Sequence, residues 1–204
     1  MSTDADPRSG RPRASSREVL AEAACELFLE QGFEATSVTD IATRAGVSRS
    51  SFFNYFASKS DVLWAALDER IEALAVALRR DGAGESGVRD AVERIADGFA
   101  PDSLALAMAN ATAMGLEDEL EHEAALRRAR IGAAVSQRLR RAGVPPLRSD
   151  VLGAAYGGAV LAAVERWAEE GPGRAALGSV LAQALAEVAT LPAPASAEPT
   201  QPLA

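Results

Sequence analysis

Residues 36–63 read TSVTDIATRAGVSRSSFFNYFASKSDVL, and this stretch predicts two short helices joined by a tight turn. Ser37, with Asp40 three residues later, has the spacing of a capping box at a helix N-terminus. Gly46 suits the left-handed backbone that ends a helix, so we expect the first short helix to stop there. Ser48 then caps the second short helix.

A longer helix is predicted on each side of this pair. Ser15 and Glu18 have capping-box spacing, and apolar residues recur every three or four positions from there to Gly32. Ser58 and Asp61 repeat that spacing, and the apolar pattern behind them continues to residue 78. Four helices are therefore expected between residues 15 and 80.

The rest of the chain keeps the helical period, and no useful length alternates with the period of two that a strand requires. Glycine and proline residues separate the segments. Further helices are expected near residues 86–100, 102–114, 117–142, 150–170 and 174–190. The predicted fold is all-α: an N-terminal three-helix helix-turn-helix domain, linked by a long fourth helix to a C-terminal helical bundle.

The composition is that of a folded protein without diffuse basic charge. The 204 residues are 48% apolar and carry a formal net charge of −8, which argues against a protein that coats nucleic acid. Basic residues gather locally: four arginines and no acid lie between residues 8 and 17, and Arg44, Arg49 and Lys59 follow. Lys59 is the only lysine in the chain.

The sequence predicts neither export nor a membrane span. No apolar run approaches the roughly 20 residues that cross a bilayer, and the N-terminus lacks the apolar stretch of a secretory signal. Cys25 is the single cysteine, so neither an intramolecular disulfide nor a metal-thiolate cluster is expected, and the thiol fits a small core residue. We therefore expect a cytoplasmic protein with no metal, no cofactor and no membrane partner.

A helix-turn-helix presents a polar helix to DNA because the preceding helix braces it against a core. Ile41 and Ala42 are suited to that bracing. The side chains expected to face outward are Ser48, Arg49, Ser50, Ser51 and Asn54. An arginine can bind guanine O6 and N7 in the major groove, and hydroxyls can bind phosphates or base edges. A solvated face on a short helix is the alternative that these residues leave open.

Residues 36–63 closely resemble the DNA-binding domain of the TetR family of transcriptional regulators. The resemblance covers roughly residues 15–65 and rests on several coordinated positions, which are Ile41-Ala42, Ala45-Gly46-Val47, Ser48, Phe56 and Ser58-Lys59. It implies that residues 48–55 form the recognition helix and that Ser37 and Thr39 approach phosphates. It also implies that Lys59 contacts a phosphate, where a compact charge adds to the positive end of the fourth helix.

Two positions depart from the family's usual pattern. The family commonly has glycine or proline in place of Ser50 and tyrosine in place of Phe53, whose missing hydroxyl loses a phosphate hydrogen bond of about 1 kcal/mol. Tyr55 is our candidate for a replacement hydroxyl, whereas Phe52 and Phe56 are expected to form a core under the recognition helix. The predicted DNA-binding residues are Ser37, Thr39, Ser48, Arg49, Ser50, Ser51, Phe53, Asn54, Tyr55 and Lys59.

The expected domain boundaries follow from these segments. Residues 15–60 form the DNA-binding domain, and residues 61–191 form a helical domain for ligand binding and dimerisation. Residues 1–14 and 192–204 are expected to be disordered because they are polar or rich in proline. The arginines of residues 1–14 fit either a basic arm that contacts DNA or a solubilising tail.

Small apolar residues line the last two predicted helices. They fill residues 153–159 and recur between residues 177 and 188, where they permit close approach of two backbones. In the TetR family the last two helices form a four-helix bundle across a dimer axis, so the resemblance implies a homodimer. Packing within one chain is the alternative.

The resemblance also implies a small-molecule inducer that binds the C-terminal domain. Methionine and aromatic side chains make adaptable apolar walls, and an asparagine can orient a polar group. The candidate ligand-binding residues are Met108, Asn110, Met114, Tyr156 and Trp167. Each of them also fits a place in the core or on the surface. His122 lies among glutamates without the spacing of a metal site.

The sequence thus predicts a homodimer whose recognition helices enter successive major grooves of a palindromic operator on double-stranded DNA. We expect a repressor that blocks polymerase and that an unidentified inducer releases from DNA. An enzyme is one alternative, but one histidine, one cysteine and scattered acids offer no catalytic set. An architectural DNA-binding protein without a ligand is another, and only the long C-terminal bundle argues against it.

Overall fold

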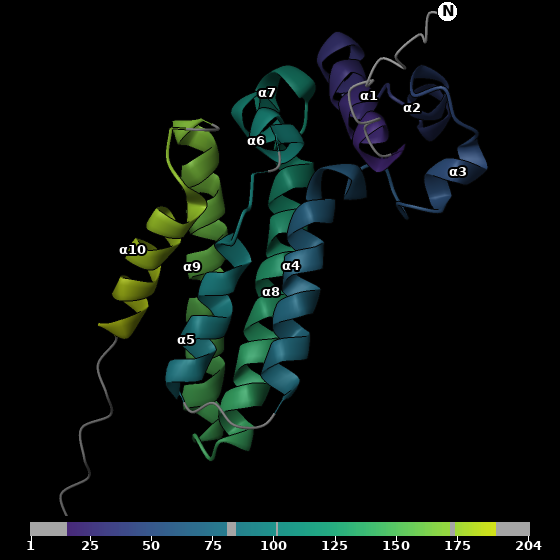
Figure 1. The fold of residues 1–204 in the computed structure, drawn as a ribbon. Coiled ribbons are helices and arrows are strands. Elements are labelled where there is room, and N and C mark those ends of the chain that lie inside the picture. Colours follow the sequence, from purple (N-terminus) through teal and green to yellow (C-terminus); the bar gives the residue numbers. More distant parts are fainter. Residues whose placement is uncertain (1–15, 81–84, 101, 172–173, 191–204) are drawn as a thin grey trace, which may run out of the picture.

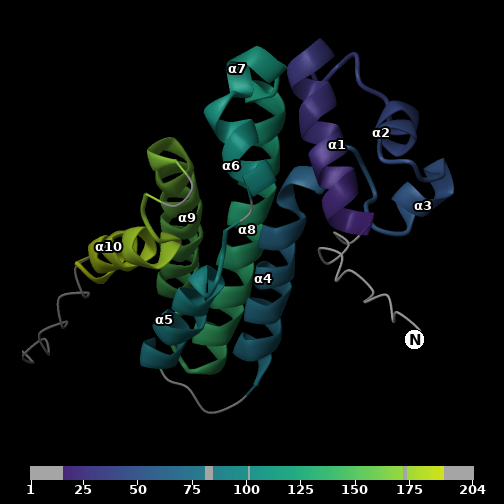
Figure 2. The same ribbon diagram turned by 45° about the horizontal axis from the view of Figure 1, so that its top comes forward.

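The computed structural model describes residues 16–80, 85–100, 102–171 and 174–190, and every regular element in those ranges is a helix. The N-terminal helices are α1 (Ser16–Gln31), α2 (Val38–Arg44), α3 (Arg49–Phe53) and α4 (Asp61–Arg79). The predicted cap at Ser15 and the two expected disordered ends lie outside the described residues. Figures 1 and 2 show α1, α2 and α3 at one end of the molecule, with α4 leading from them into a bundle of longer helices. The predicted all-α fold is confirmed.

The C-terminal helices differ from the expected ranges at several ends. They are α5 (Glu85–Glu93), the short 3₁₀ helix η1 (Arg94–Ala96), α6 (Asp102–Ala109), α7 (Ala111–Met114), α8 (Glu117–Arg141), α9 (Pro146–Glu170) and α10 (Leu177–Ala189). The single helix expected over residues 102–114 is wrong, because Asn110 leaves the helical backbone at φ −121° and ψ 23°. The start of α9 at Pro146 is four residues earlier than expected, since proline fits the first turn of a helix.

The predicted N-terminal caps are confirmed where the structure describes them. Ser37 Oγ accepts from the Asp40 amide at 3.2 Å, and an Asp40 carboxylate oxygen accepts from the Ser37 amide at 2.9 Å. Ser58 and Asp61 exchange equivalent bonds of 3.2 and 3.0 Å, although the regular helix begins only at Asp61. These bonds satisfy amides that have no partner within their helices.

Helix α3 is shorter than expected, ending at Phe53 rather than Tyr55. The amide of Tyr55 donates to the Phe52 carbonyl at 2.9 Å, a bond across three residues instead of four. Such bonds tighten the last turn of a helix, so the chain turns away toward α4.

Glycines let α8 and α9 pack closely enough for their backbones to touch. A Cβ atom on Gly132 would lie 3.1 Å from the Gly153 carbonyl oxygen, and a Cβ on Gly153 or Gly157 would overlap a backbone oxygen of α8. Packing within one chain therefore accounts for Gly153 and Gly157. Gly158 has nothing within 4 Å of its Cβ position and keeps an open side.

By length and composition alone, α9 is long and apolar enough to cross a membrane. Half of its most apolar part is buried inside the protein. Core helices of folded proteins meet the same criterion, and Val160, Leu161 and Val164 in α9 are at most 1% exposed. We interpret α9 as a core helix of the bundle.

Candidate nucleic-acid interface

Helices α2 and α3 form a helix-turn-helix that projects from the core. Ile41 and Ala42 of α2 are 0% and 2% exposed, and the turn between the helices passes through Gly46 at φ +70°. The Val47 amide donates back to the Ala42 carbonyl at 2.9 Å, which closes the turn. One side of α3 therefore rests on the core while the other faces outward.

Four aromatic residues in and after α3 divide between the core and the surface. Phe52 and Phe56 are 0% and 4% exposed, which confirms the expected core beneath α3. Phe53 and Tyr55 are each 46% exposed. Two large exposed rings beside a polar helix are consistent with a surface that meets another molecule.

The serines at the start of α3 form one hydroxyl cluster. Ser48 Oγ accepts from the Ser51 amide at 3.1 Å, so Ser48 is the N-cap that the sequence predicts. The same oxygen lies 2.8 Å from the hydroxyl oxygens of Ser50 and Ser51. These bonds hold three hydroxyls at the exposed N-terminus of the helix.

The two arginines of the helix-turn-helix have different surroundings. Arg44 donates to Glu26 and Glu30 of α1 at distances of 2.6 to 3.0 Å, so its charge ties α2 to α1. Arg49 is exposed and makes no ion pair with any described residue. Its guanidinium carbon lies 5.4 Å from the ring centre of Phe53, which supports the side chain by a cation–π contact. Arg49 is the cation that α3 presents outward.

The ammonium of Lys59 has bonding partners within the N-terminal domain. It donates to the backbone oxygens of Phe33 at 2.7 Å and Thr36 at 3.3 Å, and it lies 3.9 Å from the ring centre of Phe33. These bonds tie the start of α4 to the loop after α1. An ammonium has three donors, so one remains, and the predicted phosphate contact stays a prediction.

The other predicted DNA contacts lie at the ends of α2 and α3. Thr39 and Asn54 are exposed. Ser37 is also exposed, and its hydroxyl donates to an Asp40 carboxylate oxygen at 2.6 Å. The hydroxyl and amide of Ser37 hold the pKa of Asp40 below its usual value. All ten predicted DNA-binding residues lie in or next to α2, α3 and the start of α4, and their roles remain predictions.

The five candidate ligand-binding residues have different surroundings in the structure. Trp167 is 2% exposed and packs edge-to-face on Phe99, with ring centres 5.6 Å apart. Met114 is buried, and the Asn110 side chain donates to the Leu106 carbonyl at 2.9 Å. Met108 and Tyr156 are half-buried. Their roles as ligand contacts remain predictions.

Two grooves lie elsewhere, and none of the five candidates lines either of them. One, of about 1140 Å³, runs between α1, the first half of α4, α6 and the end of α9. The other, of about 780 Å³, lies along α8 and α9. Cys25 borders the first groove but is only 4% exposed, and burial, with a smaller effect from Glu26, raises its pKa to about 12. The thiol is therefore a core group, as expected from the sequence.

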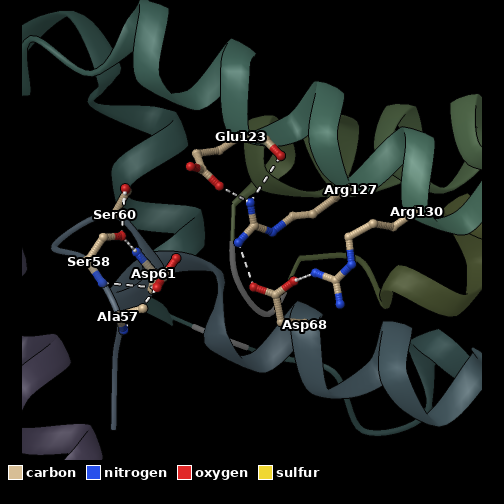
Figure 3. Close-up of polar contacts among 8 residues, drawn as sticks. All are labelled: Ala57, Ser58, Ser60, Asp61, Asp68, Glu123, Arg127 and Arg130. Atoms are coloured by element: carbon tan, nitrogen blue, oxygen red, sulfur yellow. Dashed lines mark hydrogen bonds and ion pairs between the residues drawn. The ribbon is translucent and has the colours of Figure 1, made fainter. Parts of the chain in front are cut away.

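One polar cluster in the C-terminal domain was not found from the sequence. Arg127 of α8 is 3% exposed and contacts Asp68 of α4 (Figure 3). A signal for it does exist, because Arg127 continues the buried helical period that runs through Leu120, Ala124 and Ile131. An arginine at an apolar position of this kind predicts a buried charge with a partner.

The geometry of α2 and α3 defines a helix-turn-helix, and a family model of known proteins matches this part of the chain. Residues 20–66 match the model for bacterial regulatory proteins of the tetR family. This part of the chain therefore has the sequence of a TetR-family DNA-binding domain.

Known transcriptional regulators are similar to part of this chain. A putative mycofactocin biosynthesis transcriptional regulator of Mycobacterium tuberculosis, MftR, is 41% identical over 59 residues, which are 29% of this chain and 30% of that protein. The transcriptional activator FasR of Mycolicibacterium smegmatis is 34% identical over 96 residues, 45% of this chain and 44% of that protein. The chain thus spans less than half the length of these curated relatives.

One solved structure extends the likeness over both domains. Thermus thermophilus FadR, a TetR-family transcriptional repressor crystallised with lauroyl-CoA, superposes with a TM-score of 0.55 at 27% identity. The match covers 90% of this chain and 98% of that one. The C-terminal bundle therefore also has a TetR-type arrangement.

Proposed function

We propose that this chain is a ligand-responsive repressor that binds a palindromic DNA operator through α2 and α3. In this proposal, residues 15–60 bind DNA, and residues 61–191 form a homodimer and bind a small-molecule inducer. The protein acts on DNA in the cytoplasm. Binding of the inducer favours a conformation of the dimer that no longer fits the operator, so DNA is released.

The outward face of α3 is the observation that carries the proposal. It combines an exposed arginine without a carboxylate partner among the described residues, a cluster of three hydroxyls and a supporting phenylalanine ring. In this proposal, Arg49 binds a guanine edge and the serines of the hydroxyl cluster contact phosphates.

Exposed apolar side chains on α9 and α10 support a homodimer through the last two helices. On α9, Leu147 and Val151 are 78% and 54% exposed, and Ala154 and Ala162 continue outward at helical spacing. On α10, exposed small residues recur in the same way, at Gly178, Ala182 and Ala186. Stripes of this kind let two copies of each helix pair approach closely.

The inducer is proposed from the family and from one relative. Thermus thermophilus FadR binds lauroyl-CoA in its crystal structure, which supports a ligand site in a bundle of this arrangement. We propose a ligand with an apolar portion, contacted by Met108, Asn110, Met114, Tyr156 and Trp167. Since Met114 and Trp167 are buried, such a ligand would have to separate helices of the bundle to reach them.

The proposal is tested by selecting an operator from random DNA duplexes with the full chain and then measuring the affinity of Arg49→Ala. We expect the variant to lose roughly 1–3 kcal/mol of binding free energy, the usual value of one bidentate arginine–guanine contact. Its thermal unfolding should match that of the parent, because Arg49 is exposed and makes no ion pair with a described residue.

Arg166→Ala is the matched control. Arg166 is an exposed arginine of α9 whose ion pairs with described residues are those with Glu169 and Glu170 of its own helix, so operator affinity should not change. A parent protein that enriches no sequence would contradict the proposed function. Equal affinities for the parent and Arg49→Ala would remove Arg49 from the interface.

A further inference from the structure

A buried arginine joins α4 to α8. The guanidinium carbon of Arg127 lies 4.5 Å from the ring centre of Trp64 on α4. One guanidinium nitrogen donates to an Asp68 carboxylate oxygen, also on α4, at 2.5 Å, and another donates to the Glu123 carbonyl at 3.0 Å and to the Glu123 carboxylate (Figure 3). We call Trp64, Asp68, Glu123 and Arg127 the α4–α8 clamp.

Other arginines of α8 extend this attachment along α4. Arg130 donates to the second carboxylate oxygen of Asp68 at 2.5 Å, so that carboxylate holds two guanidinium groups (Figure 3). Near the other end of α4, Arg141 donates to the carbonyl oxygens of Leu78 at 2.9 Å and Arg79 at 3.2 Å. Helix α8 therefore holds α4 at two places along its length.

The clamp is poorly suited to a role in stability alone. Desolvation of two charges offsets much of their attraction, so a buried ion pair is often no better than well-packed apolar residues. In addition, Arg127 Nε and Trp64 Nε1 are buried without a hydrogen-bond partner among the described residues. The clamp does fix the relative orientation of α4 and α8, because the two oxygens of Asp68 bind planar guanidinium groups in a defined geometry.

The direction of α4 bears on DNA binding because α4 carries the helix-turn-helix. The reciprocal bonds of Ser58 and Asp61 fix the end of the DNA-binding domain to the first turn of α4. Asp68 lies seven residues further on, about two turns along the helix. A change in the tilt of α4 is therefore passed directly to α3.

We propose that Arg127 is a positioning residue for operator binding, which acts through Asp68 to fix the tilt of α4 and hence the place of the DNA-binding domain. This inference rests on the proposed function, since in a dimer that tilt sets the separation of the two recognition helices. The length of α4 from the residues that Arg141 contacts to the start of the helix is about 27 Å. A rotation of roughly 10° would move that start by about 5 Å, more than the roughly 3.4 Å rise of one base pair.

The test is the affinity of full-length Asp68→Asn for the selected operator and for versions with the half-sites one or two base pairs closer or further apart. Arg127 keeps its contacts with Glu123 in this variant, so its charge stays paired. We expect about a 5- to 150-fold loss of affinity at the native spacing, the usual range for coupled sites. We also expect weaker discrimination among the other spacings, which a general loss of stability would not produce.

Asp150→Asn is the matched control. The Asp150 carboxylate accepts from Ser136 at 2.5 Å and Arg140 at 2.6 Å, so these bonds join α8 to α9 and involve no described residue of α4. We expect Asp150→Asn to show the same relative affinities as the parent for operators of different half-site spacing, even where its melting temperature changes. Arg130→Gln is a milder second variant, with a half-exposed side chain, and should shift the profile less than Asp68→Asn and in the same direction.

The outcomes separate the two proposals. A parent that selects no operator contradicts the proposed function. A parent that selects one, with Asp68→Asn and Arg130→Gln both keeping its spacing profile, overturns the role of the clamp alone. The role of the clamp is also overturned if Asp150→Asn changes the spacing profile as much as Asp68→Asn does.

Discussion

The DNA-binding domain and the α8–α9 pair differ in the contacts that stabilise them. The contacts within each region join residues at different separations along the chain. In the DNA-binding domain, Ser37 binds Asp40 and Ser48 binds Ser51, each across three residues. In the α8–α9 pair, Gly132 meets Gly153 across 21 positions of the sequence. Local bonds fix where the short helices begin, whereas contacts between distant residues fix how closely the long helices approach.

The two regions also use arginine differently. Arg44 of α2 is bound to glutamates of α1, and its side chain is 36% exposed, so solvent screens the pair. The Arg127 side chain is 4% exposed and lies against an indole ring. The first arginine fastens a surface helix, and the second orients two long helices in the core.

The largest effect is expected within α3, where neighbouring phenylalanines face opposite sides. Phe52→Ala should destabilise the protein by about 3–5 kcal/mol because it empties a core position. Phe53→Ala should change stability by no more than about 0.5 kcal/mol, since its ring is 46% exposed, but should weaken operator binding by removing the support of Arg49. Urea unfolding measures the first effect and DNA titration the second. Equal loss of stability in both variants would contradict the two-sided arrangement of α3.

A smaller effect is expected in α9, where neighbouring glycines also face opposite sides. Gly157→Ala should destabilise by about 1–3 kcal/mol because its new methyl group would overlap the Arg128 carbonyl oxygen. Gly158→Ala should destabilise less than Gly157→Ala, since alanine favours the helix and no described atom of the same chain lies within 4 Å of its Cβ position. Thermal unfolding at one fixed protein concentration compares the two. A neutral Gly157→Ala would show that α8 and α9 can move apart at no cost.

The smallest effect concerns the dependence of stability on pH. Hydrogen bonds from Ser136 and Arg140 hold the pKa of Asp150 below its usual value near 3.8, and Ser37 does the same for Asp40. A carboxyl group with a lowered pKa in the folded state stabilises the protein at neutral pH and loses that contribution as the pH falls through the lowered value.

Asp150→Asn and Asp40→Asn should therefore unfold more easily than the parent at pH 7, with a difference that shrinks as the pH falls below about 3.8. Added salt should reduce the effect for Asp150, because its partner Arg140 is charged and both side chains are half-exposed. Urea unfolding across the acid range measures both variants. A difference that grows toward low pH would contradict the assigned bonds.

Much of the fold could be predicted because the signals in the N-terminal domain are local. The caps at Ser37, Ser48 and Ser58 and the turn at Gly46 each depend on residues within a few positions, so their spacing is visible in the chain. The inward place of Phe52 and Phe56 followed from their position under a recognition helix. Where the prediction missed, as at Asn110 and the end of α3, a local turn interrupted a period that continued in the sequence.

The sequence by itself determined the helical period, the caps and the family resemblance, since each of these needs only neighbouring residues or a matching motif. The tertiary structure alone decided that Arg44 and Lys59 have partners inside the domain, that Gly153 and Gly157 face α8, and that Arg127 joins α4. The physical reason is that these contacts join residues 14 to 59 positions apart. The sequence shows a charged residue or a glycine in the same way whether it faces solvent or a distant helix. Only the folded chain determines its surroundings.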